Sequence, residues 1–163
     1  MAEQTPAEGN GVAAPQQRQL SLQKVYMRDV SFEVPNAPSV FRDDGQPQVQ
    51  LNLSHKATPI GDDSYEVVLT LTVTCTLNGR TAYLAEVQQA GIFGLIGFSQ
   101  EELNAVLASY APNVLFPYGR QMVSELVQNG GFPPLLLQPI NFDALYAEQM
   151  QRAAGGDVPA LNG

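Results

Sequence analysis

Apolar and polar residues alternate with a period of two in four stretches of the chain, which predicts four β-strands. The stretches span residues 20–34, 49–53, 65–77 and 81–89. In the third, four threonines face one side, and the other side is apolar: Tyr65, Val67, Leu69, Leu71, Val73, Cys75 and Leu77. A sheet with one apolar and one hydroxyl-rich face must cover the apolar face and leave the other to water or a polar partner.

Two local signals describe how these strands are connected and shaped. Asn78-Gly79 supplies the two positive-φ residues of a two-residue type I′ turn, so the strand after it is expected to return antiparallel. The alternation fails between Lys24 and Arg28, which predicts a bulge or a twist in the first strand. Together the strands predict a four-stranded antiparallel meander.

Helical spacing takes over after residue 98. Ser99 and Glu102 form a capping box that starts a first helix. A second helix is expected from Pro112, with Pro117 as a potential kink, up to Gly130-Gly131. The fold class is therefore α+β, with helices packed on one face of the sheet.

A third helix follows a segment that fits neither regular structure. Residues 132–140 contain three prolines and are otherwise almost wholly apolar, which excludes helix and central strand. Asn141 then caps a terminal helix with one apolar side: Phe142, Leu145, Tyr146 and Met150.

Composition places these elements in one domain, residues 19–152, between disordered tails at 1–18 and 153–163. A formal charge of −8 and a pI near 4.4 make nucleic-acid binding unfavourable. The apolar stretches are too short to span a bilayer, so direct membrane insertion is not expected. The start of the chain lacks a secretory signal, so a cytoplasmic location is expected.

Catalytic chemistry is not indicated by the residues present. His55 is the single histidine, in a polar stretch, and Cys75 is the single cysteine, mid-strand among apolar neighbours. One of each cannot form a zinc site, and no acidic cluster has calcium-loop spacing. The glycine-rich stretch 90–98 lacks the lysine and the spacing of a phosphate cradle. No enzyme, metal or cofactor is expected.

Two features carry a functional interpretation beside a structural one. The apolar segments 91–98 and 132–140, both expected to be irregular, either pack on the domain itself or form a groove where extended chains lose apolar surface. Asp29 and Glu33 share one side of the first strand, and Leu84 and Glu86 share one side of the fourth. This acidic face is either plain solvated surface or a dock for a basic partner.

Four blocks, in order and with matching spacing, resemble the SecB family of export chaperones. They are SFEVPNAP at 31–38, YLAEVQQAGIF at 83–93, PNVLFPY at 112–118 and NFDALY at 141–146. The resemblance spans about residues 20–150. It implies a dimer of dimers that holds unfolded precursor proteins without ATP and delivers them to the SecA translocase ATPase.

The resemblance also implies site residues. Asp29, Glu33, Leu84 and Glu86 would be the SecA-docking surface. The client groove would comprise Ile92, Phe93, Leu95, Ile96, Phe98, Phe132, Leu135, Leu136, Leu137 and Ile140. The family's tails are often acidic, whereas residues 155–163 hold one acid.

Two other functions remain open alongside this one. One is an adaptor or toxin-linked chaperone of the same fold with a single dedicated partner. The other is an enzyme or small-ligand carrier that uses the apolar cavity and a carboxylate such as Glu86.

Overall fold

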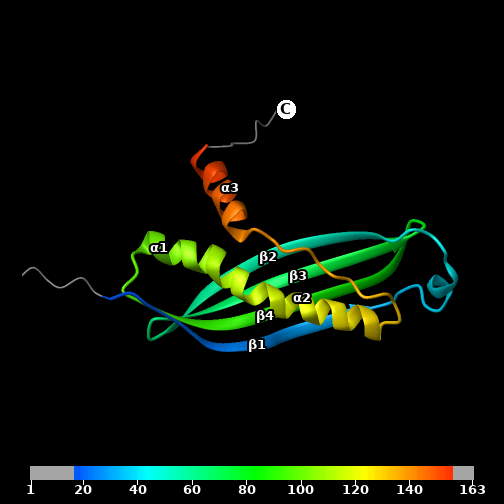
Figure 1. Cartoon of the computed structure of the whole chain (residues 1–163), viewed down its shortest axis with the longest axis horizontal. Coiled ribbons are helices and arrows are strands. Elements are labelled where there is room, and N and C mark those ends of the chain that lie inside the picture. Colours follow the sequence, from blue (N-terminus) through cyan, green and yellow to red (C-terminus); the bar gives the residue numbers. More distant parts are fainter. Residues whose placement is uncertain (1–16, 156–163) are drawn as a thin grey trace, which may run out of the picture.

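Four long antiparallel strands form the sheet in a computed structural model, which describes residues 17–155 (Figure 1). The strands are β1 (Gln19–Glu33), β2 (Gln48–Gly61), β3 (Ser64–Leu77) and β4 (Arg80–Ile96). This confirms the α+β class and the four antiparallel strands. The expected disordered tails lie largely outside the described residues, although the last helix extends to Ala154.

The strand order is β1-β4-β3-β2, which corrects the predicted meander. Strands β2, β3 and β4 do follow one another as a meander, but β1 pairs with β4 instead of β2. The connection from β1 to β2 explains this, because residues 34–47 are too many for a hairpin loop. They include a short 3-10 helix, η1 (Ser39–Arg42), and carry the chain to the opposite edge of the sheet.

The predicted turn between β3 and β4 is present, with φ of 50° at Asn78 and 75° at Gly79. β4 continues well past residue 89, so the prediction of an irregular segment at 91–98 is wrong for residues 91–96. These residues pair with β1 on one side and with β3 on the other. Gly91 reflects close packing, because a Cβ there would lie 2.9 Å from Leu115 Cδ2.

The irregularity predicted in β1 is confirmed as two register shifts against β4. One lies between Leu22 and Lys24 and the other between Met27 and Asp29, so Gln23 and Arg28 are extra residues. An extra residue reverses the alternation of the strand. For this reason even-numbered Lys24 and odd-numbered Asp29 emerge on the same face.

The helical region begins at the predicted capping box. The Ser99 hydroxyl accepts from the Glu102 N–H, and the Glu102 carboxylate accepts from the Ser99 N–H. The helices α1 (Gln100–Ala105) and α2 (Ala111–Asn129) are joined without a break by a π-helical turn, η2 (Val106–Tyr110). A π turn suits Pro112, which has no N–H for the usual bond to residue 108.

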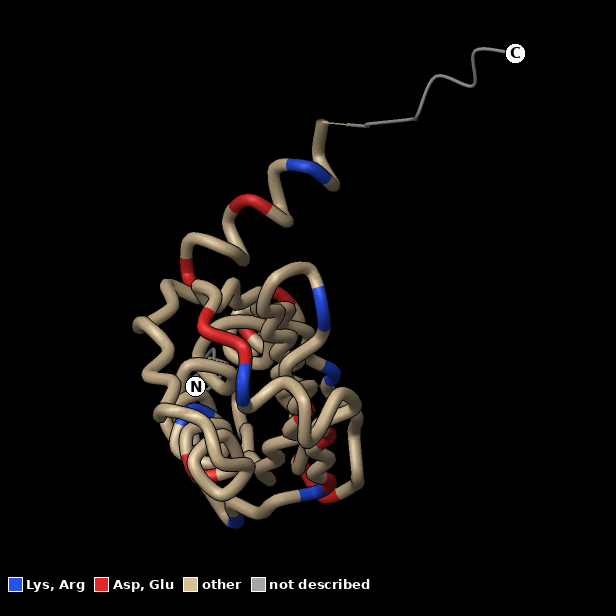
Figure 2. Tube along the Cα trace, turned by 90° about the vertical axis from the view of Figure 1, so that its right-hand side faces the viewer, with Lys and Arg blue, Asp and Glu red and all other residues tan. Residues whose placement is uncertain are grey.

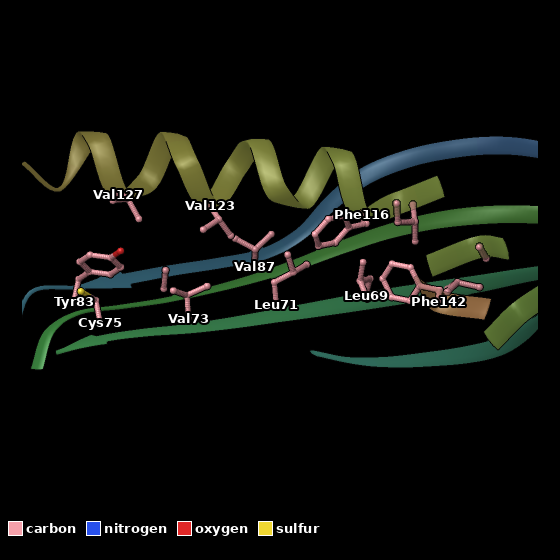
Figure 3. Close-up of a cluster of buried hydrophobic side chains, with 14 of the residues drawn as sticks. Leu69, Leu71, Val73, Cys75, Tyr83, Val87, Phe116, Val123, Val127 and Phe142 are labelled. Carbon is pink, nitrogen blue, oxygen red and sulfur yellow. The ribbon is translucent and has the colours of Figure 1, made fainter. Parts of the chain in front are cut away.

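Helix α2 lies across one face of the sheet and closes the core (Figure 1). Its inward side chains meet those of β3 and β4, as Figure 3 shows for Val123 above Val73 and Val87 and for Val127 above Tyr83. Helix and sheet approach closely at Gly119, where a Cβ would lie 2.9 Å from Leu71 Cδ1. The fully buried side chains include Phe93, Leu69, Leu71, Leu115, Val67, Val73, Val87, Val123 and Val127.

The chain then returns alongside the sheet to a last helix. Gly130 and Gly131, the latter with φ of 89°, end α2 as predicted. Residues 132–140 are neither helix nor strand, also as predicted, and we call them the crossover segment. The Asn141 carboxamide oxygen accepts from the Ala144 N–H at 3.0 Å and caps α3 (Phe142–Ala154).

Candidate functional site

The sheet face that α2 leaves uncovered is the first candidate surface, called here the open face. Cross-strand partners share a face, so the register defines its members. They are Lys24, Tyr26, Asp29, Ser31 and Glu33 of β1; Leu84, Glu86, Gln88, Ala90 and Ile92 of β4; Glu66, Val68, Thr70, Thr72 and Thr74 of β3; and Gln50, Asn52, Ser54, Lys56 and Thr58 of β2.

The four predicted docking residues come together on this open face and form what we call the acidic corner. Glu33 lies opposite Leu84, and Ser31, between Asp29 and Glu33, lies opposite Glu86. Glu86 is therefore the diagonal neighbour of both other carboxylates, at about 7–8 Å. Within the described chain, none of the three carboxylates forms an ion pair, and Glu86 accepts a long hydrogen bond of 3.4 Å from Thr72.

An aromatic-lined hollow is the second candidate, at the opposite face of the sheet. Its volume is about 390 Å³, and Phe132 of the crossover segment forms part of its wall. The Phe132 ring lies 4.9 Å from that of Tyr83 and 5.1 Å from that of Phe41, centroid to centroid. Pro133, Pro134 and Leu135 continue the wall.

Two further hollows, of about 480 and 520 Å³, lie beside α3. The three hollows follow β2 in order: Val49 borders the first, Leu53 the second and Pro59 the third, while His55 lies between the second and third. Ten residues of extended strand span about 33 Å. A segmented track therefore runs along β2 on the helix side of the sheet, and we call it the β2 track.

The predicted groove residues do not gather at one place. Phe132 and Leu135 line the β2 track, whereas Phe93 and Leu95 are buried in the chain's own core. Ile92 faces the opposite way, on the open face. Ile96 and Leu136 are exposed, and three residues are half-buried against the core: Phe98, Leu137 and Ile140.

Several residues that line the β2 track were missed by sequence reasoning. Phe41 and Val49 border the aromatic hollow, and Tyr146 borders both hollows beside α3. The alternation of β2 and the apolar side of the last helix were visible in the sequence. Their meeting could not be inferred, because it depends on how the crossover segment places α3.

Helix α3 is attached mainly through its first turn. Phe142 packs edge-on against Phe116, with ring centroids 5.8 Å apart, and the buried Ser109 hydroxyl of the π turn donates to the Asp143 carboxylate. Beyond Tyr146 the helix is exposed, including Met150. It projects from the body of the molecule and carries charges of both signs (Figure 2).

The titratable side chains near these hollows do not form a catalytic group. Burial raises the pKa of the Cys75 thiol and that of the Tyr83 phenol, so both stay protonated at neutral pH. His55 lies opposite Leu69, six residues along β3 from Cys75 and about 20 Å away. The described residues hold no cluster of three or more potential metal ligands. None of the described helices has the length and apolar character to cross a membrane.

Comparison with known proteins identifies the family. The family model described as preprotein translocase subunit SecB matches residues 13–153. The chain belongs to the SecB family. The protein-export protein SecB of Xanthomonas campestris is 52% identical over 153 residues, which cover 91% of this chain and 90% of that one. Its counterpart in Stenotrophomonas maltophilia is 50% identical over 157 residues, covering 93% and 91%.

Membership of the SecB family makes the chain a protein-export chaperone and excludes the enzyme considered above, because SecB is a non-enzymatic family. A solved structure shares the fold at greater distance. It is a SecB-like chaperone of Mycobacterium tuberculosis in complex with a peptide from an antitoxin, with a TM-score of 0.59 and 19% identity, covering 74% of this chain and 90% of that one.

Proposed function

We propose that the chain holds unfolded precursor proteins in an extended form, without nucleotide, and passes them to the SecA translocase. Clients bind along the β2 track, and SecA docks on the acidic corner. The observation that carries the proposal is the placement of these two surfaces on opposite faces of one sheet. A client and the motor can then be bound at the same time.

The β2 track suits an extended polypeptide of variable sequence. Its hollows lie in line, with apolar residues in every wall and polar residues of α3 beside the second and third, so each can take a side chain of an extended chain. Apolar burial contributes about 25 cal/mol per Å² and is not directional, which tolerates many sequences. Several weak contacts along one long chain add up through effective concentration.

The acidic corner suits a basic partner. Its three carboxylates lack ion pairs within the described chain, and the chain carries a formal charge of −8. A complementary surface would associate quickly and with strong salt dependence. Leu84, half-buried between the acids, supplies an apolar contact that fixes the docked position.

Assembly as a dimer of dimers and a cytoplasmic location complete the proposal. Tyr110 and Tyr118, on the outer side of the helical layer, are 45% and 51% exposed. Exposed aromatic side chains on one helix are typical of subunit contacts. Sedimentation equilibrium would test the assembly, with a mass of four chains as the expected result.

A refolding assay tests the holding activity. A slow-folding precursor is diluted from denaturant with and without the protein, in the absence of nucleotide. Arrested refolding at one tetramer per precursor, released on addition of SecA, is the expected result. Refolding at the unassisted rate contradicts the proposal, and capture of one stoichiometric partner from many offered would favour the dedicated adaptor instead.

Charge reversal tests the docking surface. We expect Asp29→Lys or Glu86→Lys to weaken SecA binding at least tenfold while arrest of precursor refolding persists. Asp44→Lys is the matched control, because Asp44 is exposed in the loop between η1 and β2, away from the open face. Unchanged SecA affinity in the first two variants would refute the docking assignment.

A further inference from the structure

Residues that lie opposite one another on neighbouring strands form a row across the sheet. Both lysines of the chain, Lys24 and Lys56, lie on the open face in neighbouring rows. Lys24 shares a row with Ile92 and Glu66, and Lys56 shares the next row with Val68. They come from opposite edge strands of the sheet, β1 and β2. We call this part of the open face the lysine band.

The lysines are available to a partner. Both side chains are exposed, and neither forms an ion pair within the described chain. The nearby acid, Glu66, is already occupied: its carboxylate accepts from the Tyr26 hydroxyl at 2.9 Å and pairs with Arg28 at 2.8 Å. The lysine band therefore keeps two uncompensated positive charges in a chain whose net charge is −8.

The open face is thus divided by charge along the strands. Rows at Leu84, Glu86 and Gln88 hold the acidic corner, and rows at Ala90 and Ile92 hold the lysine band. Along β4 the row of Lys24 lies about 13 Å from the row of Asp29 and about 20 Å from Glu86. Both spacings exceed the Debye length of about 10 Å at 0.1 M salt, so a partner meets two regions of opposite sign.

A partner of ordinary interface size that covers the acidic corner extends towards the lysine band. The whole open face between rows 84 and 92 measures about 26 Å by 15 Å, or about 400 Å² in plan. A stable protein interface covers about 800 Å² on each partner. A uniformly basic partner of that size would press its charges against the two lysines, and like charges in contact cost several kcal/mol.

We propose that the lysine band binds an acidic segment of the same partner that docks on the acidic corner, which rests on the proposed docking of SecA. The docking region of SecA would then be bipolar, with basic residues over the acidic corner and carboxylates about 13–20 Å further along the strands. Half-buried Ile92 and the buried Val68 give that segment an apolar floor. The two signs together fix the direction in which the partner lies on the sheet.

Charge reversal of the lysines tests this on the full chain. Lys24→Glu with Lys56→Glu should weaken SecA binding at least tenfold by calorimetry, and Lys→Gln at both sites should weaken it less. Arg42→Glu is the matched control, because Arg42 is an exposed cation at the end of η1, off the open face. Asp29→Lys is measured beside them to report on the acidic corner.

The outcomes separate this inference from the proposed function. Weakened binding in the lysine and the Asp29 variants, with Arg42→Glu unchanged, supports both. If only Asp29→Lys weakens SecA binding, the docking proposal stands and the role of the lysine band is overturned. Tighter SecA binding by the lysine variants also overturns the role of the lysine band. Unchanged affinity in all variants overturns both.

A second measurement needs no substitution. Reductive methylation with ¹³C-formaldehyde labels the two lysine side chains, together with the α-amino group, and keeps their charge. Addition of SecA to the labelled protein should shift both dimethyl-lysine signals, and 0.5 M salt should reverse the shift. Signals that stay in place while SecA is bound would overturn the proposal.

Discussion

The two faces of the sheet are built from the same strands with opposite chemistry. On the covered face, β3 presents Leu69, Leu71 and Val73, each 1% exposed or less, beneath α2. On the open face, the residues between them are Thr70 and Thr72, which remain half-buried without any helix above them. The alternation of one strand thus separates a surface that holds the fold together from one that stays free for a partner.

The contrast between the two faces predicts whether a substitution affects stability or binding. A change on the covered face removes packing and lowers the stability of the whole subunit. We expect a change on the open face to affect stability little and to alter binding of the proposed partner. The β2 track is intermediate, because its residues pack against the core and also border open hollows.

The largest expected effect is a loss of stability on the covered face. Leu71→Ala should lower the free energy of unfolding by about 3 kcal/mol, because a fully buried leucine leaves a cavity. Thr70→Ala, one residue away on the open face, should change it by less than about 0.5 kcal/mol. Urea unfolding of both variants measures the contrast, and equal effects would contradict the division between the faces.

The next prediction concerns the β2 track. Phe132→Ala removes the ring that contacts Phe41 and Tyr83, and should weaken binding of an unfolded precursor about tenfold. Leu136→Ala is the control, since Leu136 is 74% exposed and borders none of the three hollows. Titration of a fluorescent precursor compares the two. A stronger effect at Leu136 would place the groove outside the track.

Local signals predicted most of the elements. The turn at Asn78, the capping box at Ser99 and the cap at Asn141 depend on neighbours within three residues, so the sequence is enough to find them. The strand order was not accessible in this way, because the pairing of β1 with β4 is decided over more than fifty residues.

The candidate surfaces also differ in how far local signals in the sequence could predict them. Parity assigned Asp29 and Glu33 to one side of the first strand and Leu84 and Glu86 to one side of the fourth. Only the family resemblance grouped the four, because the predicted meander placed these strands at opposite edges, and they meet through the pairing of β1 with β4. The predicted groove residues, by contrast, do not gather at one place. Gly91 and Gly94 made residues 91–98 look like a flexible joint, whereas Gly91 is required by the close approach of Leu115 to β4. The β2 track joins seven separate segments of chain, and no periodicity within one segment describes that.

A smaller effect should come from the bulge that brings Asp29 to the open face. The Glu66 carboxylate forms an ion pair with Arg28, the extra residue of the bulge, and accepts a hydrogen bond from the Tyr26 hydroxyl. Glu66→Gln should cost about 0.2–1 kcal/mol of stability, the usual worth of a partly exposed ion pair. Burial is the main reason that the pKa of Tyr26 is raised, and Glu66 adds to it. The substitution should therefore lower this pKa towards 10.

NMR titration of the tyrosine ring signals measures that change, and the amide signal of Asp29 reports whether the register moves. Arg28→Ala combined with Glu66→Gln completes a double-mutant cycle. Additive losses of stability and an unmoved Tyr26 pKa would mean that the three side chains do not act together.

The smallest effect concerns His55, which points to the helix side of β2 while Ser54 and Lys56 point to the open face. Partial burial lowers the pKa of His55 below its usual value, and Glu148 and Arg152 of α3 border the same hollow. The unfolded chain therefore binds a proton more readily than the folded one, so this group reduces stability as the pH falls through about 6.5 and below. Because the chain has a single histidine, His55→Gln should flatten the dependence of urea unfolding on pH between 7 and 5.5. An unchanged slope would show that His55 is as solvated as the open face beside it.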